Sequence, residues 1–289
     1  MTTLARQIVT LSKPRVVMLL VFTGVCGAYA AAGGSPELAP VVAVIVAGTL
    51  SASGANAVNQ GLDADIDAIM TRTRKRPVPM QQLRPSLAIA TGVVFVAAAV
   101  TLMYALTNWV AATLMFAAAA TYVVVYTVIL KRRSWNNIVI GGAAGAFPPL
   151  IGAAAVTGDV DALGLYMFAF VFFWTPPHFW TLSMLLRDDY AAANVPMLAA
   201  VASQRATALQ VALYIVLLGA MAWLPLVAGY GGLGFAVVTT GISIEWFRRT
   251  TRLFVDPARA QTLSAYKFSL LYLAIAFLTL AVEPALPWS

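Results

Sequence analysis

The chain has 289 residues, of which 61% are hydrophobic and only 10% are charged. Soluble domains of average composition carry about 25% charged residues, so this composition excludes an ordinary soluble globular protein. The formal net charge is +7, and a basic balance can indicate either nucleic acid or an anionic membrane surface as a partner. We expect a single integral-membrane domain that covers residues 1–289.

Charge-free stretches long enough to cross a bilayer recur along the whole chain. A membrane-spanning helix needs about 20 mostly apolar residues. We expect one span each within residues 16–35, 41–62, 134–158 and 162–186, and two spans each within residues 86–130 and 206–244, with turns near residues 107–108 and 229–232. A last, shorter run covers residues 268–282. The sequence predicts an all-α polytopic membrane bundle of nine transmembrane helices.

The distribution of charge predicts the orientation of this bundle. If the N-terminus is cytoplasmic, all 18 lysine and arginine residues fall on the cytoplasmic side. The opposite loops then hold only acidic residues, namely Glu37, Asp159, Asp161 and Glu283. Cytoplasmic loops of membrane proteins are enriched in lysine and arginine. We therefore expect a plasma (inner) membrane protein with its long loops cytoplasmic and its net charge directed at membrane lipids, and we expect no nucleic-acid partner.

The beginning of the chain also imitates a secretory signal peptide. Lys13 and Arg15 precede an apolar stretch, and the sequence Ala28-Tyr29-Ala30 is similar to a cleavage site. We expect this segment to be retained as the first span, because of the family resemblance described below.

Three aspartates follow the second predicted span, where carboxylates are rare. On a helix Asn59, Asp63 and Asp67 share one face, while Asp65 points away, where it faces water or pairs with Arg72. A carboxylate within the membrane costs roughly 2.5–3.5 kcal/mol on insertion scales, so such residues are functional candidates. Oxygen ligands of this kind suit Mg²⁺, which often bridges one or two carboxylates to substrate phosphates. The pattern indicates a Mg²⁺-dependent diphosphate site.

Basic residues lie directly after these aspartates and again after the fourth predicted span. We expect Arg72, Arg76, Lys131 and Arg132 to meet the negative charge of a diphosphate. The simpler interpretation is that the basic residues only set the topology and contact anionic lipid. That interpretation suits Arg74, Lys75 and Arg84 best.

The sixth predicted span is rich in aromatic residues around Pro176-Pro177-His178. Adjacent prolines remove two backbone donors, so we expect them to break the helical ladder inside the protein or beside a cavity. His178 is the only histidine and would lie roughly 12 Å below the cytoplasmic surface at 1.5 Å per residue. It is either a hydrogen-bonded packing residue, or a ligand or proton carrier in the site.

The spacing Asn59-x-x-x-Asp63-x-x-x-Asp67, ahead of Arg72-Thr-x-x-Arg76-Pro, resembles the first aspartate-rich motif of the UbiA superfamily of intramembrane prenyltransferases. Further segments are similar to its haem-modifying branch. They comprise residues 65–73, 126–132, 136–142, 148–152 and 174–180. These segments extend from the second to the sixth predicted span, and beyond Met197 we find no motif.

The resemblance implies a prenyltransferase that moves a farnesyl group from farnesyl diphosphate to the 2-vinyl group of haem B and yields haem O. It implies Mg²⁺ as the cofactor, haem B as a substrate, and a downstream haem A synthase as a partner. The implied catalytic residues are Asn59, Asp63, Asp67 and His178. The implied substrate-binding residues are Arg72, Arg76, Lys131, Arg132, Asn137, Trp174, Asp188, Asp189 and Tyr190. The implied metal ligands are Asp63, Asp67 and Asp188.

The second acidic loop departs from the broader superfamily, and other functions stay open. Asp188 and Asp189 are adjacent rather than four residues apart, so they cannot both hold one ion as Asp63 and Asp67 can. The acceptor could instead be a quinone-precursor ring or chlorophyllide. From another class, a secondary transporter also has many spans with broken helices and buried acids. The segments at 136–142 and 174–180 favour haem, and the acids beside a basic loop favour a diphosphate over a transported ion.

Overall fold

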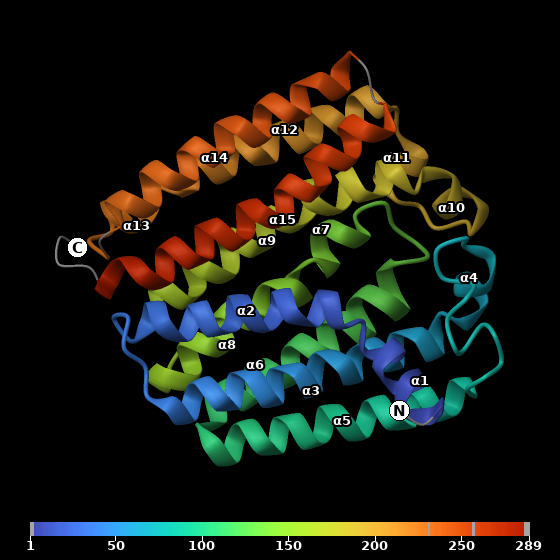
Figure 1. Ribbon diagram of the computed structural model, residues 1–289, viewed down its shortest axis with the longest axis horizontal. Helices are drawn as coiled ribbons and strands as arrows, with labels where there is room; N and C mark the ends of the chain where they lie inside the picture. Colours follow the sequence, from blue (N-terminus) through green and yellow to red (C-terminus); the bar gives the residue numbers. More distant parts are fainter. Residues whose placement is uncertain (1–2, 231, 256–257, 286–289) are drawn as a thin grey trace.

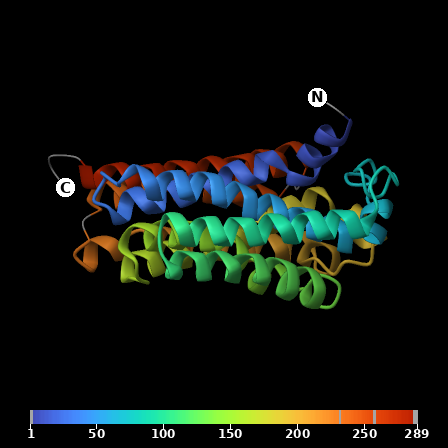
Figure 2. The same cartoon turned by 90° about the horizontal axis from the view of Figure 1, so that it is seen from below.

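The computed structural model describes residues 3–230, 232–255 and 258–285, with residues 3–6 and 8 described by their backbone alone. Every regular element in these ranges is helical. The long helices run alongside one another, with the N-terminus and α4 at one end of the bundle and the C-terminal end of α15 at the other (Figures 1 and 2). This arrangement confirms the predicted all-α membrane architecture.

Long helices form the bundle, and short helices connect them. The elements of the first half are α1 (Thr3–Ser12), α2 (Pro14–Ala31), α3 (Leu38–Leu62), α4 (Ala64–Ile69), α5 (Pro85–Leu106), α6 (Trp109–Ala120), the π-helix η1 (Thr121–Leu130), α7 (Asn137–Gly141) and α8 (Ala143–Thr157). Those of the second half are α9 (Ala162–Leu185), α10 (Arg187–Ala192), α11 (Leu198–Val201), α12 (Gln204–Met221), α13 (Leu224–Val227), α14 (Leu233–Thr251), η2 (Arg252–Phe254), α15 (Arg259–Val282) and η3 (Glu283–Ala285).

Eight helical segments of the described chain are long and apolar enough to cross a membrane. The expected turn near residues 107–108 is confirmed, because α5 ends at Leu106 and the Asn108 side chain caps α6 by accepting the N–H of Ala111 at 2.9 Å. The eighth predicted span corresponds to α14, which packs along α12 and α15 but is less apolar and ends in charged residues. Nine spans and a cytoplasmic N-terminus therefore stay predictions.

One expected span is part of a longer helix, and one expectation about a helix is wrong. The last apolar run, residues 268–282, lies within α15, which already begins at Arg259 and carries the exposed Lys267. Pro176 and Pro177 do not interrupt α9, which is continuous from Ala162 to Leu185. The φ that proline imposes is compatible with a helix, so the missing donors alone need not end it. Both prolines are buried, as expected for such a site inside protein.

Buried apolar side chains form three main clusters in the bundle. One cluster joins α2, α9, α12, α14 and α15 through large side chains such as Phe170, Trp246 and Tyr272. A second joins α3, α5, α6 and α8 largely through alanine and methionine. A third, which includes Ile66, Tyr126 and Tyr190, connects the loops at the α4 end of the bundle. The loops that carry the predicted site are thus packed onto the bundle rather than free.

Helices α2 and α8 approach closely because glycines line their contact. A Cβ added at Gly152 would overlap the carbonyl oxygen of Gly24, and one added at Gly27 would overlap that of Pro149. Small residues allow membrane helices to pack backbone against backbone. Since α8 also packs on α9, this contact helps to fix the helix that carries His178.

We predict that Gly152→Ala destabilises the protein, because the added methyl group must separate α2 from α8. Overpacking of this kind typically costs about 1–3 kcal/mol. Thermal unfolding of the detergent-solubilised protein measures the effect. Gly145→Ala is the matched control, since it lies on the same helix and a Cβ there would meet nothing within 4 Å. Equal melting temperatures for the two variants would contradict the close-approach argument.

We also predict the orientation of the bundle in the membrane. In a Cys26→Ala background, which removes the only cysteine, Lys75→Cys should be labelled only from the cytoplasm and Asp159→Cys only from outside. Both positions are exposed in the structure. An impermeant maleimide applied to intact cells and to inverted vesicles measures this. Labelling of position 75 in intact cells would reverse the topology and the placement of the predicted site.

Candidate functional site

Helix α3 ends within the aspartate-rich motif instead of continuing through it. Helix α3 ends at Leu62, Asp63 caps it, and α4 begins at Ala64. The spacing of four nevertheless survives, because the N–H of Asp67 donates to the Asp63 carbonyl at 2.8 Å. Asn59, Asp63 and Asp67 are 4%, 1% and 2% exposed, whereas the Asp65 side chain is 65% exposed. The predicted common face is confirmed, although it spans two helices.

Asp67 is held by the loop that follows α4. Its Oδ2 atom forms an ion pair with Arg76 Nη1 at 2.7 Å, and its carbonyl accepts the Thr73 hydroxyl at 2.9 Å. Thr73 is buried, whereas Arg72 on the same loop is exposed. The loop therefore folds back over α4 and brings Arg76 against the carboxylate, while the expected contact of Arg76 with a diphosphate stays a prediction.

Asp63 is held by residues of the π-helix η1 and the residue after it. Lys131 Nζ donates to Asp63 Oδ2, and the Asn59 amide donates to the same oxygen at 2.7 Å. Asn59 also donates to the Thr127 hydroxyl at 3.1 Å. The π-helical turn, in which the N–H of Lys131 donates to the Tyr126 carbonyl, aligns Thr127 and Lys131 with α3. π-Helical segments occur often at functional sites.

The buried residues Asn59, Asp63 and Asp67, with the cations beside them, form the inner site. Arg132 lies outside it and pairs with Asp65. Its guanidinium donates to both Asp65 oxygens at 2.7 and 2.8 Å and to the Leu62 carbonyl at 3.2 Å, and it lies 3.6 Å from Asp63 Oδ1. This hydrogen bonding lowers the pKa of the Asp65 carboxyl and raises the pKa of the Arg132 guanidinium. Asp65 therefore faces water, which was one of the two expectations, and its ion-pair partner is Arg132 rather than Arg72.

The sequence did not indicate Lys13 or Tyr122 as site residues. Lys13 lies between α1 and α2, and its Nζ donates to Asn59 Oδ1 at 3.1 Å and to the Tyr122 hydroxyl at 3.4 Å. Burial lowers the pKa of Lys13 to about 7, and the positive charges of Arg76 and Lys131 act in the same direction. The charge pattern of the sequence accounts for Lys13 as a topology signal. Only its contact with Asn59 in the folded chain identifies it as a residue of the site.

The carboxylates meet the requirements of a Mg²⁺ site. Asp63 Oδ1 is buried and accepts no hydrogen bond. Within the described ranges, however, no three His, Cys, Asp or Glu side chains gather closely enough to hold an ion. Mg²⁺ commonly takes one or two carboxylates and completes its shell with water and substrate phosphate. The oxygen-only donors Asp63 and Asp67 fit this pattern, while Asp188 does not join them and its metal role stays a prediction.

The second acidic loop is tied to the first by Asp189. Its carboxylate accepts the backbone N–H groups of Thr71 at 3.1 Å and Arg72 at 3.3 Å. Asp188 is exposed on α10, and Tyr190 is buried in the third apolar cluster. Burial raises the pKa of Tyr190, and the positive charges of Arg72 and Arg76 oppose this rise. The structure thus brings the two predicted loops together, with Asp189 as their connection.

His178 is held by α15 rather than by the acidic loops. Its ring stacks between Trp174 and Tyr266, with centroid distances of 4.4 and 5.1 Å. The Nδ1 atom lies 2.7 Å from Ser269 Oγ, and that hydroxyl donates to the Tyr266 carbonyl at 2.6 Å. With the single hydroxyl proton directed at the Tyr266 carbonyl, the assignment that satisfies both contacts has Nδ1–H donating to Ser269. This tautomer leaves a lone pair on Nε2.

Trp174 and Asn137 each donate a hydrogen bond to a backbone carbonyl of another segment. The Trp174 indole N–H donates to the Ser269 carbonyl at 2.9 Å, which again joins α9 to α15. The Asn137 amide donates to the Lys131 carbonyl at 3.3 Å, while its own Oδ1 is buried without a partner. Asn137 therefore supports the backbone of a site lysine, and its predicted contact with substrate stays a prediction.

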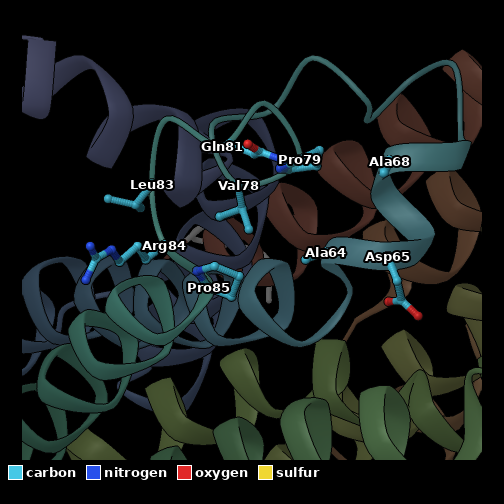
Figure 3. Close-up of a pocket in the computed structure, with 9 residues that line it drawn as sticks. All are labelled: Ala64, Asp65, Ala68, Val78, Pro79, Gln81, Leu83, Arg84 and Pro85. Atoms are coloured by element: carbon cyan, nitrogen blue, oxygen red, sulfur yellow. The ribbon is translucent and has the colours of Figure 1, made fainter.

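Two cavities open at the same end of the bundle. The larger one, about 500 Å³, lies between α4 and the segment Val78–Pro85, and Asp65 lines it but Asp63 and Asp67 do not (Figure 3). The smaller one, about 390 Å³, is lined by Leu62, Asp63, Asp65, Thr127, Val128 and Arg132. The smaller cavity therefore reaches the carboxylate site, and the larger one lies beside it.

Comparison with known proteins agrees with this geometry. The model of the UbiA prenyltransferase family matches residues 20–279. A protohaem IX farnesyltransferase of Thermus thermophilus is 43% identical over 280 residues, which are 97% of this chain but 46% of that relative, so the chain spans about half its length. A protohaem IX farnesyltransferase of Granulibacter bethesdensis is 44% identical over 95% of this chain and 89% of that relative.

Solved structures of low sequence identity share the fold. A digeranylgeranylglyceryl phosphate synthase superposes with a TM-score of 0.78 at 15% identity, covering 97% of this chain and 98% of the other. A UbiA homologue from Archaeoglobus fulgidus, bound to GPP and Mg²⁺, superposes with a TM-score of 0.69 at 15% identity, covering 96% of this chain and 100% of the other. By sequence and by fold, the chain belongs to the UbiA prenyltransferase family of multi-pass membrane proteins.

Proposed function

We propose that this protein transfers the farnesyl group of farnesyl diphosphate to the 2-vinyl group of haem B and so produces haem O. The observation that carries the proposal is the pair of buried carboxylates, Asp63 and Asp67, each held against a cation where α3 meets α4. Relatives named protohaem IX farnesyltransferase, similar over nearly the whole of this chain, support haem as the acceptor.

The carboxylate end would bind the diphosphate. Asp63 and Asp67 would hold Mg²⁺, and Asp188 is a further candidate ligand. When bound there, the ion supplies positive charge against the negative charge that develops on the departing diphosphate. Lys131 and Arg76 lie beside the carboxylates. From there they can also donate hydrogen bonds to the oxygens of the diphosphate. Arg72 and Arg132 would extend this positive surface toward the loop side.

The aromatic part of the bundle would protect the reactive carbon chain. Breaking the C–O bond leaves an allylic cation, which water would capture unless the cavity excludes it. Ring faces favour positive charge, and Trp174 and Tyr266 present stacked rings on α9 and α15. A site within the membrane also receives both lipid-soluble substrates without transfer into water.

His178 would serve the haem. With Nδ1–H donated to Ser269, its Nε2 can either coordinate the haem iron or accept a proton, as neutral imidazole commonly does. The fixed partner on α15 sets both the tautomer and the ring orientation, as hydrogen-bonded partners of metal-binding histidines do. Asn137, Asp189 and Tyr190 would position the surrounding loops.

We place the enzyme in the plasma (inner) membrane with its acidic loops cytoplasmic and a haem A synthase as the consumer of haem O. The purified protein in detergent should consume farnesyl diphosphate only when Mg²⁺ and haem B are both present, and mass spectrometry should detect haem O. Consumption with a quinone-precursor ring, but not with haem, would replace the proposed acceptor.

We predict that Asp63→Asn and Asp67→Asn each abolish turnover, by roughly 100-fold or more, because each removes a charge that would hold Mg²⁺ and leaves a buried cation unpaired. Steady-state formation of haem O measures the loss. Asp65→Asn is the matched control and should be mild, since its exposed side chain pairs with Arg132 outside the inner site. Turnover within tenfold of wild type in both inner variants would remove the central proposal.

We predict that His178→Ala impairs the use of haem while binding of farnesyl diphosphate stays nearly intact, because the residue belongs to the α9–α15 contact and not to the carboxylate group. Titration of each substrate separately measures the two effects. A shift of the Soret band between wild type and variant would indicate iron contact, and slowed chemistry with an unshifted band would indicate proton transfer. A variant normal in both assays would leave His178 as a packing residue.

A further inference from the structure

Among the described residues, three cations lie around Asn59, Asp63 and Asp67, and one of them, Lys13, forms no ion pair. Arg76 pairs with Asp67 at 2.7 Å, and Lys131 pairs with Asp63. Lys13 forms no ion pair with a carboxylate in the part of the chain that the structure describes. Its Nζ donates only to the neutral acceptors Asn59 Oδ1 and Tyr122 Oη.

Lys13 is directed into the bundle although a lysine at a membrane edge would ordinarily face headgroups. Its backbone is left-handed, with φ 51° and ψ 63°, directly before the proline that starts α2. Non-glycine residues adopt this region at an energetic cost, and such strain concentrates at functional sites. Arg15, in the first turn of α2, is exposed instead. The turn between α1 and α2 therefore places one basic residue inside and leaves the other outside.

A half-buried lysine that has neutral hydrogen-bond partners and no direct ion pair is unfavourable, and this points to an anion as its ligand. Asp63 and Asp67 contribute −2 and Arg76 and Lys131 contribute +2, so the two pairs are neutral and the protonated form of Lys13 leaves +1. A divalent ion on the carboxylates would raise this to +3. A prenyl diphosphate, which carries up to three negative charges, is the class of ligand that balances this excess.

We propose that Lys13 is a diphosphate-binding residue of this enzyme, which donates a hydrogen bond from Nζ to the substrate beside Lys131 and Arg76. This inference rests on the proposed function. When the C–O bond of the prenyl diphosphate breaks, its electron pair stays with the diphosphate oxygen, so the leaving group gains one negative charge. The negative charge of a bound diphosphate favours the protonated form of Lys13, which then stabilises the charge on the leaving group. The Asn59 amide, which bridges Lys13 and Asp63, connects this cation to the metal-binding carboxylate.

Binding of inorganic diphosphate in the presence of Mg²⁺, measured by calorimetry on the full-length protein in detergent, tests the proposal. Lys13→Met should weaken binding by about tenfold or more, the scale of one charge-assisted hydrogen bond. Lys13→Arg, which keeps the charge, should restore most of the affinity. Arg15→Met removes an equal charge from the same turn and should bind as wild type does. Haem binding, followed by the Soret band, should be unchanged in all three variants.

Distinct results would overturn the inference and the proposed function. Wild-type affinity for Mg²⁺-diphosphate in Lys13→Met would overturn the role of Lys13 and leave the proposed function standing. Joint loss of diphosphate and haem binding in both Lys13 variants would assign Lys13 a structural role and also overturn it. A wild-type protein that neither binds Mg²⁺-diphosphate nor consumes farnesyl diphosphate would remove the proposed function, and this inference with it.

Discussion

The burial of two carboxylates next to one another is the constraint on which the arrangement of this end of the bundle depends. Asp63 and Asp67 are almost inaccessible to water, and neighbouring buried anions are tolerated only when charge and hydrogen bonds compensate them. Two separate chain segments supply the cations that pair with the carboxylates, and a third brings Lys13 to the amide that bonds Asp63. The loop after α4 supplies Arg76, the end of η1 supplies Lys131, and the turn before α2 brings Lys13 to Asn59.

Each of these segments needs an irregular backbone to deliver its side chain. The end of α3 turns at Asp63 so that α4 can start in a new direction. The π-helical turn sets Thr127 and Lys131 against α3, and Lys13 is left-handed. Local departures from ideal geometry persist where the surrounding contacts over-determine them. Here the apolar cluster of Ile66, Tyr126 and Tyr190 provides those contacts directly beside the charged group.

Much of the architecture was predictable because it follows from local patterns. Charge-free length located the helices, and the turn residues at 107–108 separated α5 from α6. Spacing by four brought Asn59, Asp63 and Asp67 to one face even though the helix ends between them. The pairing of Asp65 with Arg132, the inward turn of Lys13 and the contact of Asp189 with backbone N–H groups were not predictable. They depend on which loops meet in space, and neither spacing nor composition encodes that.

The C-terminal helix illustrates how a segment without a recognisable motif can still determine chemistry. Beyond Met197 the sequence offered only compatible length, yet α15 supplies Ser269, which accepts Nδ1–H of His178 and whose carbonyl accepts the Trp174 indole N–H. When the Ser269 hydroxyl donates to the Tyr266 carbonyl of its own helix, its oxygen accepts from the imidazole. A residue of this kind leaves no pattern in the sequence, because its contacts use one hydroxyl and one backbone carbonyl, and every helix has backbone carbonyls. Its effect arises only when α15 packs on α9, and it then fixes which nitrogen of the only histidine can meet a substrate.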